Sequence, residues 1–413
     1  MATRALILVE GHRANGPLYI QAAHHLGLHP ITLSADPAQY DYLMAESIDA
    51  VRVDTGNLDA LIRECTRRKT THDIVGITGF TGLEESLYVT VANLCRHFDL
   101  PGPSPSSIEA CCDKFTQRHI LANAGIPVPA YRLATEVADV EIAAAEIGLP
   151  VIIKPAVGSG SSGVRLCRNL DELAEHTAYL LGGGHSWTSA PRILVEEFAQ
   201  GPYYSADTMG NKVVAIGTAN FMSLPNFVVS KCIFPAPLSD DEYERLAELS
   251  LSCLRTLSLY WGPANIEFRW TKRGPVVIEV NPRLPGWTTP RLIHLAYGVD
   301  LITEHIKLMI GTECDLRPRY LHTAAVQNLV PDRDGILDWI DGGSQAAAVP
   351  GISEVKFYVK ANTPIVRRGD YLDSIGHVIA ASPTHTRTDA ILQRAVDLIG
   401  WSITSGITSD ERK

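Results

Sequence analysis

Two stretches of this sequence carry residues whose types and spacing could do chemistry. The first is 150–163, PVIIKPAVGSGSSG, where Lys154 ends a short β-branched run and a Gly/Ser segment follows at once. Glycine lets backbone N–H groups turn inward, and such donors together with hydroxyls suit phosphate oxygens. A flexible linker is the plainer alternative, but a lysine directly before the segment argues against it. Gly158 and Gly163 have the G-x-x-x-x-G spacing, yet valine and arginine follow where a Walker A loop needs Lys and Ser/Thr. The sequence therefore predicts a phosphate loop of another class.

The second stretch contains oxygen-bearing side chains on two predicted neighbouring strands. Glu267 lies on the first strand, and Glu279 and Asn281 lie on the second. Antiparallel neighbours can bring these side chains together, and carboxylates with an amide oxygen are ligands that Mg²⁺ prefers. The alternative is a pair of solvent-facing carboxylates on an exposed hairpin. The flanking residues are apolar, however, and a buried acidic pair needs a cation. Arg283 follows closely and suits a fork contact to an oxyanion.

Composition limits the partners that we expect. The chain has 413 residues and a formal net charge of −10, so a nucleic-acid surface is not expected. It contains no apolar run long enough to span a membrane, and its first residues lack the apolar core of a signal peptide. The eight cysteines are scattered without metal-ligand spacing, which is typical of a reducing compartment. We expect a cytoplasmic protein with neither a nucleic-acid nor a membrane partner.

The elements that must position these residues follow an α/β pattern. Strand-like runs alternate with helical stretches in the first hundred residues, which predicts a parallel sheet. The proline-rich segment 101–105 predicts a boundary. A helix beginning near Lys114 follows, and short strands and a closing helix occupy the chain beyond 320. The predicted domains are an N-terminal α/β domain, a lid that carries the Gly-rich loop, and a catalytic core with the substrate portion, over residues 1–110, 111–192 and 193–413.

Four motifs, in this order and spacing, resemble the ATP-grasp superfamily of carboxylate–amine ligases over essentially the whole chain. They are DKFTQRHILANAGIPVP, IIKPAVGSGSSGV, ILVEEFAQG and NIEFRW…VVIEVNPR. The separation between Glu267 and Glu279 is similar to that in the biotin-carboxylase and amino-acid-ligase branches. The resemblance implies the ATP-grasp fold, with an N-terminal parallel α/β domain, a two-lobed α+β centre and a C-terminal α+β portion.

The resemblance also implies how ATP is held. Lys114 and Lys154 would hold the α- and β-phosphates. The residues that would fold over the β- and γ-phosphates are Gly158, Ser159, Gly160, Ser161, Ser162 and Gly163. The hinge strand and its flank, which would meet the adenosine, supply Glu196, Glu197, Phe198, Ala199 and Tyr203. Where the family has a ribose-binding acid this chain has Tyr203, so either Asp207 or a loop residue substitutes for it, or ribose binding is weaker.

The same resemblance assigns the metal and catalytic residues. Glu267, Glu279 and Asn281 would bind two Mg²⁺ ions, or Mn²⁺ in their place. Arg283 would stabilise the phosphoryl group in transfer and the acyl-phosphate oxyanion. Lys231 lies where related ligases often carry a basic residue near the γ-phosphate. The implied reaction converts a substrate carboxylate into an acyl phosphate, which an amine then attacks to give an amide, ADP and phosphate.

The segment 281–301 resembles the corresponding segment of L-amino-acid (dipeptide) ligases, which include enzymes that assemble peptide antibiotics. The implied acyl pocket contains Gly286, Trp287, Thr288 and Thr289. Arg291 would either grip a second carboxylate or lie on the surface at a helix start. The resemblance further implies amino-acid substrates and a homodimer. Two alternatives remain, which are a carboxylating enzyme of the biotin-carboxylase or purine-pathway type and a non-catalytic nucleotide-binding regulator.

Overall fold

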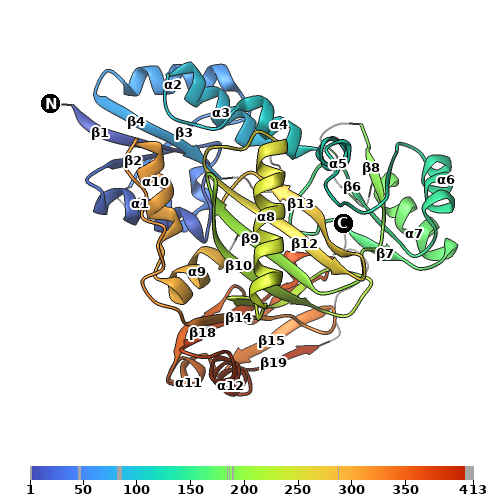
Figure 1. Ribbon diagram of the computed structural model, residues 1–413. Coiled ribbons are helices and arrows are strands. Elements are labelled where there is room, and N and C mark those ends of the chain that lie inside the picture. Colours follow the sequence, from blue (N-terminus) through green and yellow to red (C-terminus); the bar gives the residue numbers. More distant parts are fainter. Residues whose placement is uncertain are drawn as a thin grey trace.

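The computed structural model describes residues 2–44, 48–80, 86–183, 185, 187, 190–286 and 288–404 (Figure 1). Within these ranges the chain forms four sheets. The described helices include none that is long and apolar enough to cross a membrane. The predicted α/β architecture is confirmed, with a parallel N-terminal sheet followed by antiparallel sheets.

The N-terminal domain is built on a parallel sheet with the strand order β3-β2-β1-β4. Its strands are β1 (Thr3–Val9), β2 (His29–Ser34), β3 (Asp49–Arg52) and β4 (His72–Gly79). Its helices are α1 (Asn15–His25), α2 (Leu58–Arg68) and α3 (Ser86–His97). Apolar side chains of β1 are buried because helices cover both faces of a parallel sheet.

The proline-rich segment is less of a break than the sequence predicts. Pro105 is the first residue of helix α4 (Pro105–Cys112), where a missing N–H costs no hydrogen bond. The side chain of Ser104 caps this helix by accepting the N–H of Ser107. Helix α5 (Lys114–Asn123) follows directly, so the chain passes from the N-terminal domain to the lid through two consecutive helices.

The lid contains an antiparallel sheet with the order β5-β8-β6-β7. Its elements are β5 (Tyr131–Ala134), α6 (Val137–Ile147), β6 (Val151–Pro155), β7 (Arg165–Cys167), α7 (Leu170–Leu181) and β8 (Ile193–Glu197). Strand β8 pairs with both β5 and β6, so the lid sheet continues to Glu197, beyond the boundary predicted at residue 192. The sequence could not place β8 because its composition suits either sheet.

The largest sheet has eight strands in the order β13-β12-β9-β10-β11-β14-β18-β16. The strands are β9 (Tyr203–Met209), β10 (Lys212–Phe221), β11 (Val229–Phe234), β12 (Pro263–Thr271), β13 (Gly274–Asn281), β14 (Thr323–Leu329), β16 (Ile352–Phe357) and β18 (Gly376–Ser382). Helix α8 (Asp240–Thr256) lies across β9 and β10 (Figure 1). The remaining C-terminal elements are α11 (Gly343–Ala347), α12 (His385–Val396), β15 (Gly335–Asp341), β17 (Thr363–Ile365) and β19 (Gly400–Thr404).

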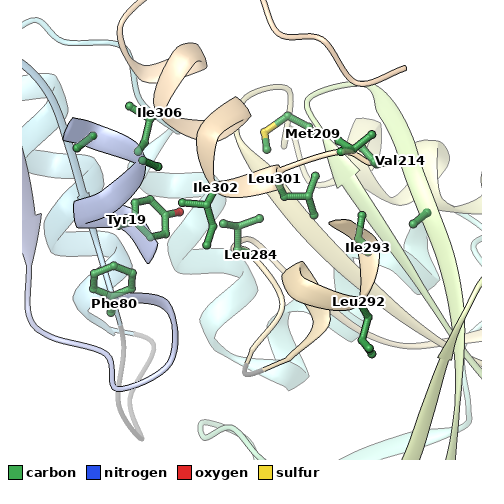
Figure 2. Close-up of a cluster of buried hydrophobic side chains, with 14 of the residues drawn as sticks. Tyr19, Phe80, Met209, Val214, Leu284, Leu292, Ile293, Leu301, Ile302 and Ile306 are labelled. Carbon is green, nitrogen blue, oxygen red and sulfur yellow. The ribbon is translucent and has the colours of Figure 1, made fainter. Parts of the chain in front are cut away.

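A hydrophobic cluster joins the N-terminal domain to the core (Figure 2). Tyr19 and Phe80 of the N-terminal domain pack with Leu284 and with helices α9 (Thr289–Tyr297) and α10 (Leu301–Met309). Burying such side chains contributes about 1.5–3 kcal/mol each. The cluster therefore fixes the carboxyl end of the N-terminal sheet against the segment that follows Arg283.

Candidate active site

A cavity of about 1730 Å³ opens between the N-terminal domain, the lid and the large sheet. All three units supply its walls, and it extends to the C-terminal strands β16 and β18. Most of the residues predicted to do chemistry line it, namely Lys114, Lys154, Gly158, Ser159, Gly160, Ser161, Ser162, Glu196, Glu197, Phe198, Ala199, Tyr203, Glu267, Glu279, Asn281, Arg283, Gly286, Thr288, Thr289 and Arg291. Trp287 lies outside the described residues.

Lys154 is held by a buried charge network at the end of β6. Its Nζ lies 2.6 Å from Oε2 of Glu196 on the paired strand β8. Arg118 of α5, which is fully buried, approaches the same carboxylate with Nε at 2.8 Å from Oε1. Burial alone would raise the pKa of Glu196, but the charges of Arg118 and Lys154 lower it below its usual value. Glu196 therefore stays ionised and orients Lys154, which is a role that the sequence does not reveal.

Helix α5 also covers the edge of the large sheet. Strand β13 is an edge strand, so its outward carbonyls have no strand partner. Arg118 donates to the carbonyls of Val277 and Ile278, both at 2.6 Å. Gln117 donates to the carbonyl of Val280 at 2.7 Å and accepts that residue's N–H at 2.8 Å. These bonds tie helix α5 to the strand that carries Glu279.

Lys114 is the first residue of α5 and is almost fully buried. The side chain of Asp113 caps the helix through the N–H of Thr116 at 2.7 Å. The backbone N–H of Lys114 donates to the carbonyl of Ala156, at 2.7 Å, on the chain that enters the Gly-rich loop. Its Nζ contacts the carbonyl of Gly158 and lies 3.0 Å from Oε1 of Glu279. The ammonium group of Lys114 thus lies between the Gly-rich loop and Glu279.

The Gly-rich loop adopts backbone conformations that favour glycine. Gly158 and Gly160 have φ of 145° and 66°, and Ser161 adopts 64°, which is strained for a residue with a side chain. A Cβ on Gly160 would lie 2.3 Å from the ring of Tyr371, in the 3₁₀ turn Tyr371–Asp373 of the C-terminal portion. Gly163 does not line the cavity. It packs on Pro155 at the end of the Gly-rich loop.

Glu267 and Glu279 are directly opposite in the β12–β13 ladder. Burial and the charge of Glu279 raise the pKa of Glu267 to about 7. Burial also acts to raise the pKa of Glu279, but Lys114 and Lys154 outweigh it and lower that pKa. Nδ2 of Asn281 lies 3.5 Å from Oε1 of Glu267. Two buried carboxylates and an amide form a hard oxygen set that a divalent cation would satisfy.

The described residues contain no cluster of three or more histidine, cysteine or carboxylate side chains with metal-ligating geometry. The candidate site has only two carboxylates, and nucleotide phosphates commonly complete the coordination of Mg²⁺ in such sites. Arg283 lies beside the set, with one guanidinium nitrogen 3.3 Å from Oδ1 of Asn281. Its charge acts on both Glu267 and Glu279. The residues therefore fit bound Mg²⁺ together with a nucleotide.

The hinge region has an aromatic wall. The guanidinium carbon of Arg269 lies 4.8 Å from the centroid of Phe221 and 5.5 Å from that of Tyr203. Such cation–π contacts hold the rings in place. Asp207, an alternative ribose ligand, is fully buried, bonds Nδ2 of Asn265 at 2.8 Å and is absent from the cavity lining. Tyr203 does line the cavity.

Lys231 does not join the site. Its Nζ lies 2.7 Å from Oδ1 of Asp389 on α12, and the side chain is absent from the cavity lining. Its neighbour Cys232 lines the cavity instead, because successive side chains of β11 point to opposite faces of the sheet. The structure therefore does not bring Lys231 together with the other predicted site residues. Arg291 lines the cavity and lies 3.3 Å from the hydroxyl of Ser353.

Sequence reasoning missed Arg118, Gln117 and Tyr371 as supporting residues. The four-residue spacing between Lys114 and Arg118 places them on one helical face, which is the signal that could have found the arginine. Tyr371 lies more than two hundred residues from Gly160 along the chain, and no local pattern connects them.

Comparisons with known proteins agree with this geometry. Residues 113–317 match the family described as the carbamoyl-phosphate synthase L chain, ATP-binding domain, and residues 327–404 match L-amino acid ligase C-terminal domain 2. The uncharacterized protein y4rH of Sinorhizobium fredii is 57% identical over 400 residues, covering 97% of this chain and 83% of that protein. Human carnosine synthase 1 is 30% identical over 253 residues, covering 56% of this chain but only 30% of that protein.

Among solved structures, L-amino acid ligase from Bacillus licheniformis superposes with a TM-score of 0.82 at 18% identity, covering 98% of this chain and 100% of that chain. At that identity the likeness shows the fold. The two family matches and the site geometry carry the assignment further. The chain belongs to the ATP-grasp superfamily and combines its ATP-binding domain with the C-terminal domain of the L-amino acid ligases.

Proposed function

We propose that this protein is an ATP-dependent ligase that joins a substrate carboxylate to the amine of an amino acid and releases ADP and phosphate. One observation carries the proposal: a single cavity holds the phosphate-loop residues, the acidic pair Glu267 and Glu279, and Arg283. Phosphoryl transfer depends mainly on positioning and charge stabilisation, and this arrangement supplies both. No covalent nucleophile from the protein is needed.

In the proposed reaction a carboxylate oxygen of the substrate attacks the γ-phosphorus, the bond from phosphorus to ADP breaks, and an acyl phosphate forms. The amine nitrogen then attacks the carbonyl carbon, the carbon–oxygen bond to phosphate breaks, and the amine releases a proton to solvent. Lys154, Lys114 and the Gly-rich loop orient the phosphates, while Arg283 stabilises the oxyanion. Bound Mg²⁺ would supply charge neutralisation at the phosphate oxygens, held by Glu267, Glu279 and Asn281.

The C-terminal domain favours amide ligation over carboxylation. Residues 327–404 match the L-amino acid ligase domain, and strands β16 and β18 within it line the same cavity as the phosphate loop. The proposed product is a dipeptide or a similar small amide, such as occurs in peptide antibiotics. An intact acidic pair with Arg283 argues against a non-catalytic regulator.

The test is phosphate release from MgATP against pairs of L-amino acids, with mass spectrometry of the products. The proposal predicts a mass equal to two substrates minus water, with one ADP for each product. Lys154→Met is the inactive control, and Lys231→Met, outside the cavity, is the matched lysine control. Phosphate release that needs only bicarbonate would replace the proposal with the carboxylating alternative. A protein that binds ATP and turns over nothing with any pair would contradict it.

Homodimerisation stays a prediction from the family resemblance, and a cytoplasmic location stays a prediction from the composition. We propose a homodimer, and sedimentation velocity at micromolar concentration tests it, since a single species at the 45.0 kDa monomer mass would contradict it.

A further inference from the structure

Residues 10–16 form the turn between β1 and α1 together with the first two residues of α1. This segment lies outside both family matches, and several specific contacts fix its conformation. Glu10 adopts a positive φ of 66°, a conformation that costs free energy in a non-glycine residue. Its carboxylate accepts from four donors, which are the hydroxyl of Thr55 at 2.6 Å, the hydroxyl of Ser34 and the N–H of Ala35, both at 2.8 Å, and the hydroxyl of Tyr40 at 3.4 Å. The domain thus holds the start of the turn in a fixed, strained shape.

Two glycines let tyrosines pack directly on this turn. A Cβ on Gly11 would lie 2.4 Å from the ring of Tyr40, and a Cβ on Gly16 would lie 2.0 Å from the hydroxyl of Tyr42. That hydroxyl accepts the backbone N–H of His12 at 3.1 Å. The turn is therefore fixed on both sides of His12.

The ring of His12 has one nitrogen committed to the backbone. Nδ1 accepts the N–H of Asn15 at 2.9 Å and that of Ala14 at 3.3 Å, so it carries no proton. The proton of the neutral ring is consequently on Nε2, which is a donor. Among the described residues Nε2 has no hydrogen-bond partner, and His12 lines the cavity. Burial, followed by the charge of Arg283, lowers the pKa of His12 to about 4, so the donor is neutral at physiological pH.

His12 and Arg283 come from different domains but are held in one arrangement. The ring of His12 lies 5.8 Å from that of Phe80, and Phe80 packs in the same cluster as Leu284, the residue after Arg283 (Figure 2). A neutral N–H donor near a guanidinium suits an anion, because both groups offer only N–H donors to a ligand. The two groups thus define an oxyanion subsite between the domains.

We propose that Nε2–H of His12, with Arg283, binds the substrate carboxylate through the oxygen that does not attack phosphorus, and holds that same oxygen as it becomes the oxyanion when the amine attacks. This inference rests on the proposed ligase function and adds a catalytic residue from the N-terminal domain. A fixed donor aimed at a developing oxyanion acts without reorganisation during the reaction.

The decisive variant is His12→Asn. Asparagine is a preferred helix cap, so its side-chain oxygen can replace Nδ1 as the acceptor for Asn15 while the Nε2 donor is removed. We expect an unchanged melting temperature and unchanged ADP affinity, and a loss of about 10²–10³-fold in kcat/KM for the carboxylate substrate. The KM for the amine should stay within twofold. His12→Gln, whose amide N–H extends to the place of Nε2, should recover part of the loss. His25→Asn, on the exposed end of α1, is the matched control.

A second readout does not depend on activity. Nitrogen NMR of the ¹⁵N-histidine-labelled protein should show one histidine, absent in His12→Asn, that stays in the neutral Nε2–H form at pH 5.5. An imidazolium or an Nδ1–H form would overturn the inference. So would a kcat/KM in His12→Asn equal to that of wild type while wild type makes amide, which would leave the ligase function standing. If wild type makes no amide with any pair, the ligase function fails and this inference falls with it.

Discussion

The buried network around Glu196 allows stability and nucleotide binding to be separated by two substitutions. Arg118 is fully buried, donates twice to Glu196 and once each to the carbonyls of Val277 and Ile278. Arg118→Met leaves edge carbonyls of β13 unpaired and removes a buried charge partner, which costs about 3–5 kcal/mol. Lys154→Met leaves Glu196 with both bonds from Arg118, so the cost is about 1.5–3 kcal/mol, that of one bond to a charged group.

The difference of about 2 kcal/mol predicts that Arg118→Met melts about 2 °C lower than Lys154→Met, because the unfolding entropy of a 413-residue chain is about 0.9 kcal/mol/K. Nucleotide affinity should show the reverse order, because Lys154 lines the cavity and Arg118 does not. Losing one charge-assisted contact to phosphate should weaken MgADP binding about 10- to 100-fold in Lys154→Met. Scanning calorimetry and titration calorimetry measure the two quantities. The reasoning is refuted if Lys154→Met binds MgADP like wild type, or if Arg118→Met melts no lower than Lys154→Met.

Three further predictions test other parts of the structure. Gly160→Ala places a Cβ 2.3 Å from the ring of Tyr371 and should raise the KM for ATP at least tenfold. Adding Tyr371→Ala should recover part of this loss. Equal KM values in the single and double variants would contradict the contact. Lys231→Met should keep its activity and lose at most about 1 kcal/mol, since it removes only a partly exposed ion pair; loss of turnover would return Lys231 to the site. Burial lowers the pKa of His305 to about 3, whereas an unfolded histidine titrates near about 6.5, so only the unfolded state takes up a proton between these values. The free energy of unfolding should therefore fall as pH decreases below 6.5, by about 1.4 kcal/mol per pH unit from this group. The melting temperature of His305→Gln, which can still pair with Tyr19, should fall less over the same pH range. Parallel curves of melting temperature against pH for the two proteins would refute this.

The parts of the fold and site that the sequence predicts correctly depend on local pattern or on adjacent strands. Glu267 and Glu279 lie on strands joined by a tight turn, so the sequence predicts that they come close together. The structure pairs them directly, by means of a register shift between Glu267 and Phe268 that the turn alone does not predict. The parallel N-terminal sheet follows from the alternation of strands and helices. Lys154 and the Gly-rich loop are contiguous in the chain.

The parts that the sequence does not predict depend on long-range contacts. Lys231 lies on a central strand whose two faces are both partly covered, so alternation alone does not say which face meets the cavity, and its partner Asp389 is 158 residues away. The ion pair between Arg118 and Glu196 spans 78 residues. His12 acquires its role from Tyr42 and Arg283, which tertiary packing alone brings to the turn.

The most direct test of the proposed ligase follows oxygen from the substrate carboxylate. The amino acid that supports turnover would be labelled with ¹⁸O in its carboxyl group, and the phosphate released from MgATP would be analysed by mass spectrometry. Activation as an acyl phosphate predicts one ¹⁸O atom in each phosphate for each amide formed, because the attacking carboxylate oxygen leaves with phosphorus. Unlabelled phosphate, or label found in AMP, would contradict the account.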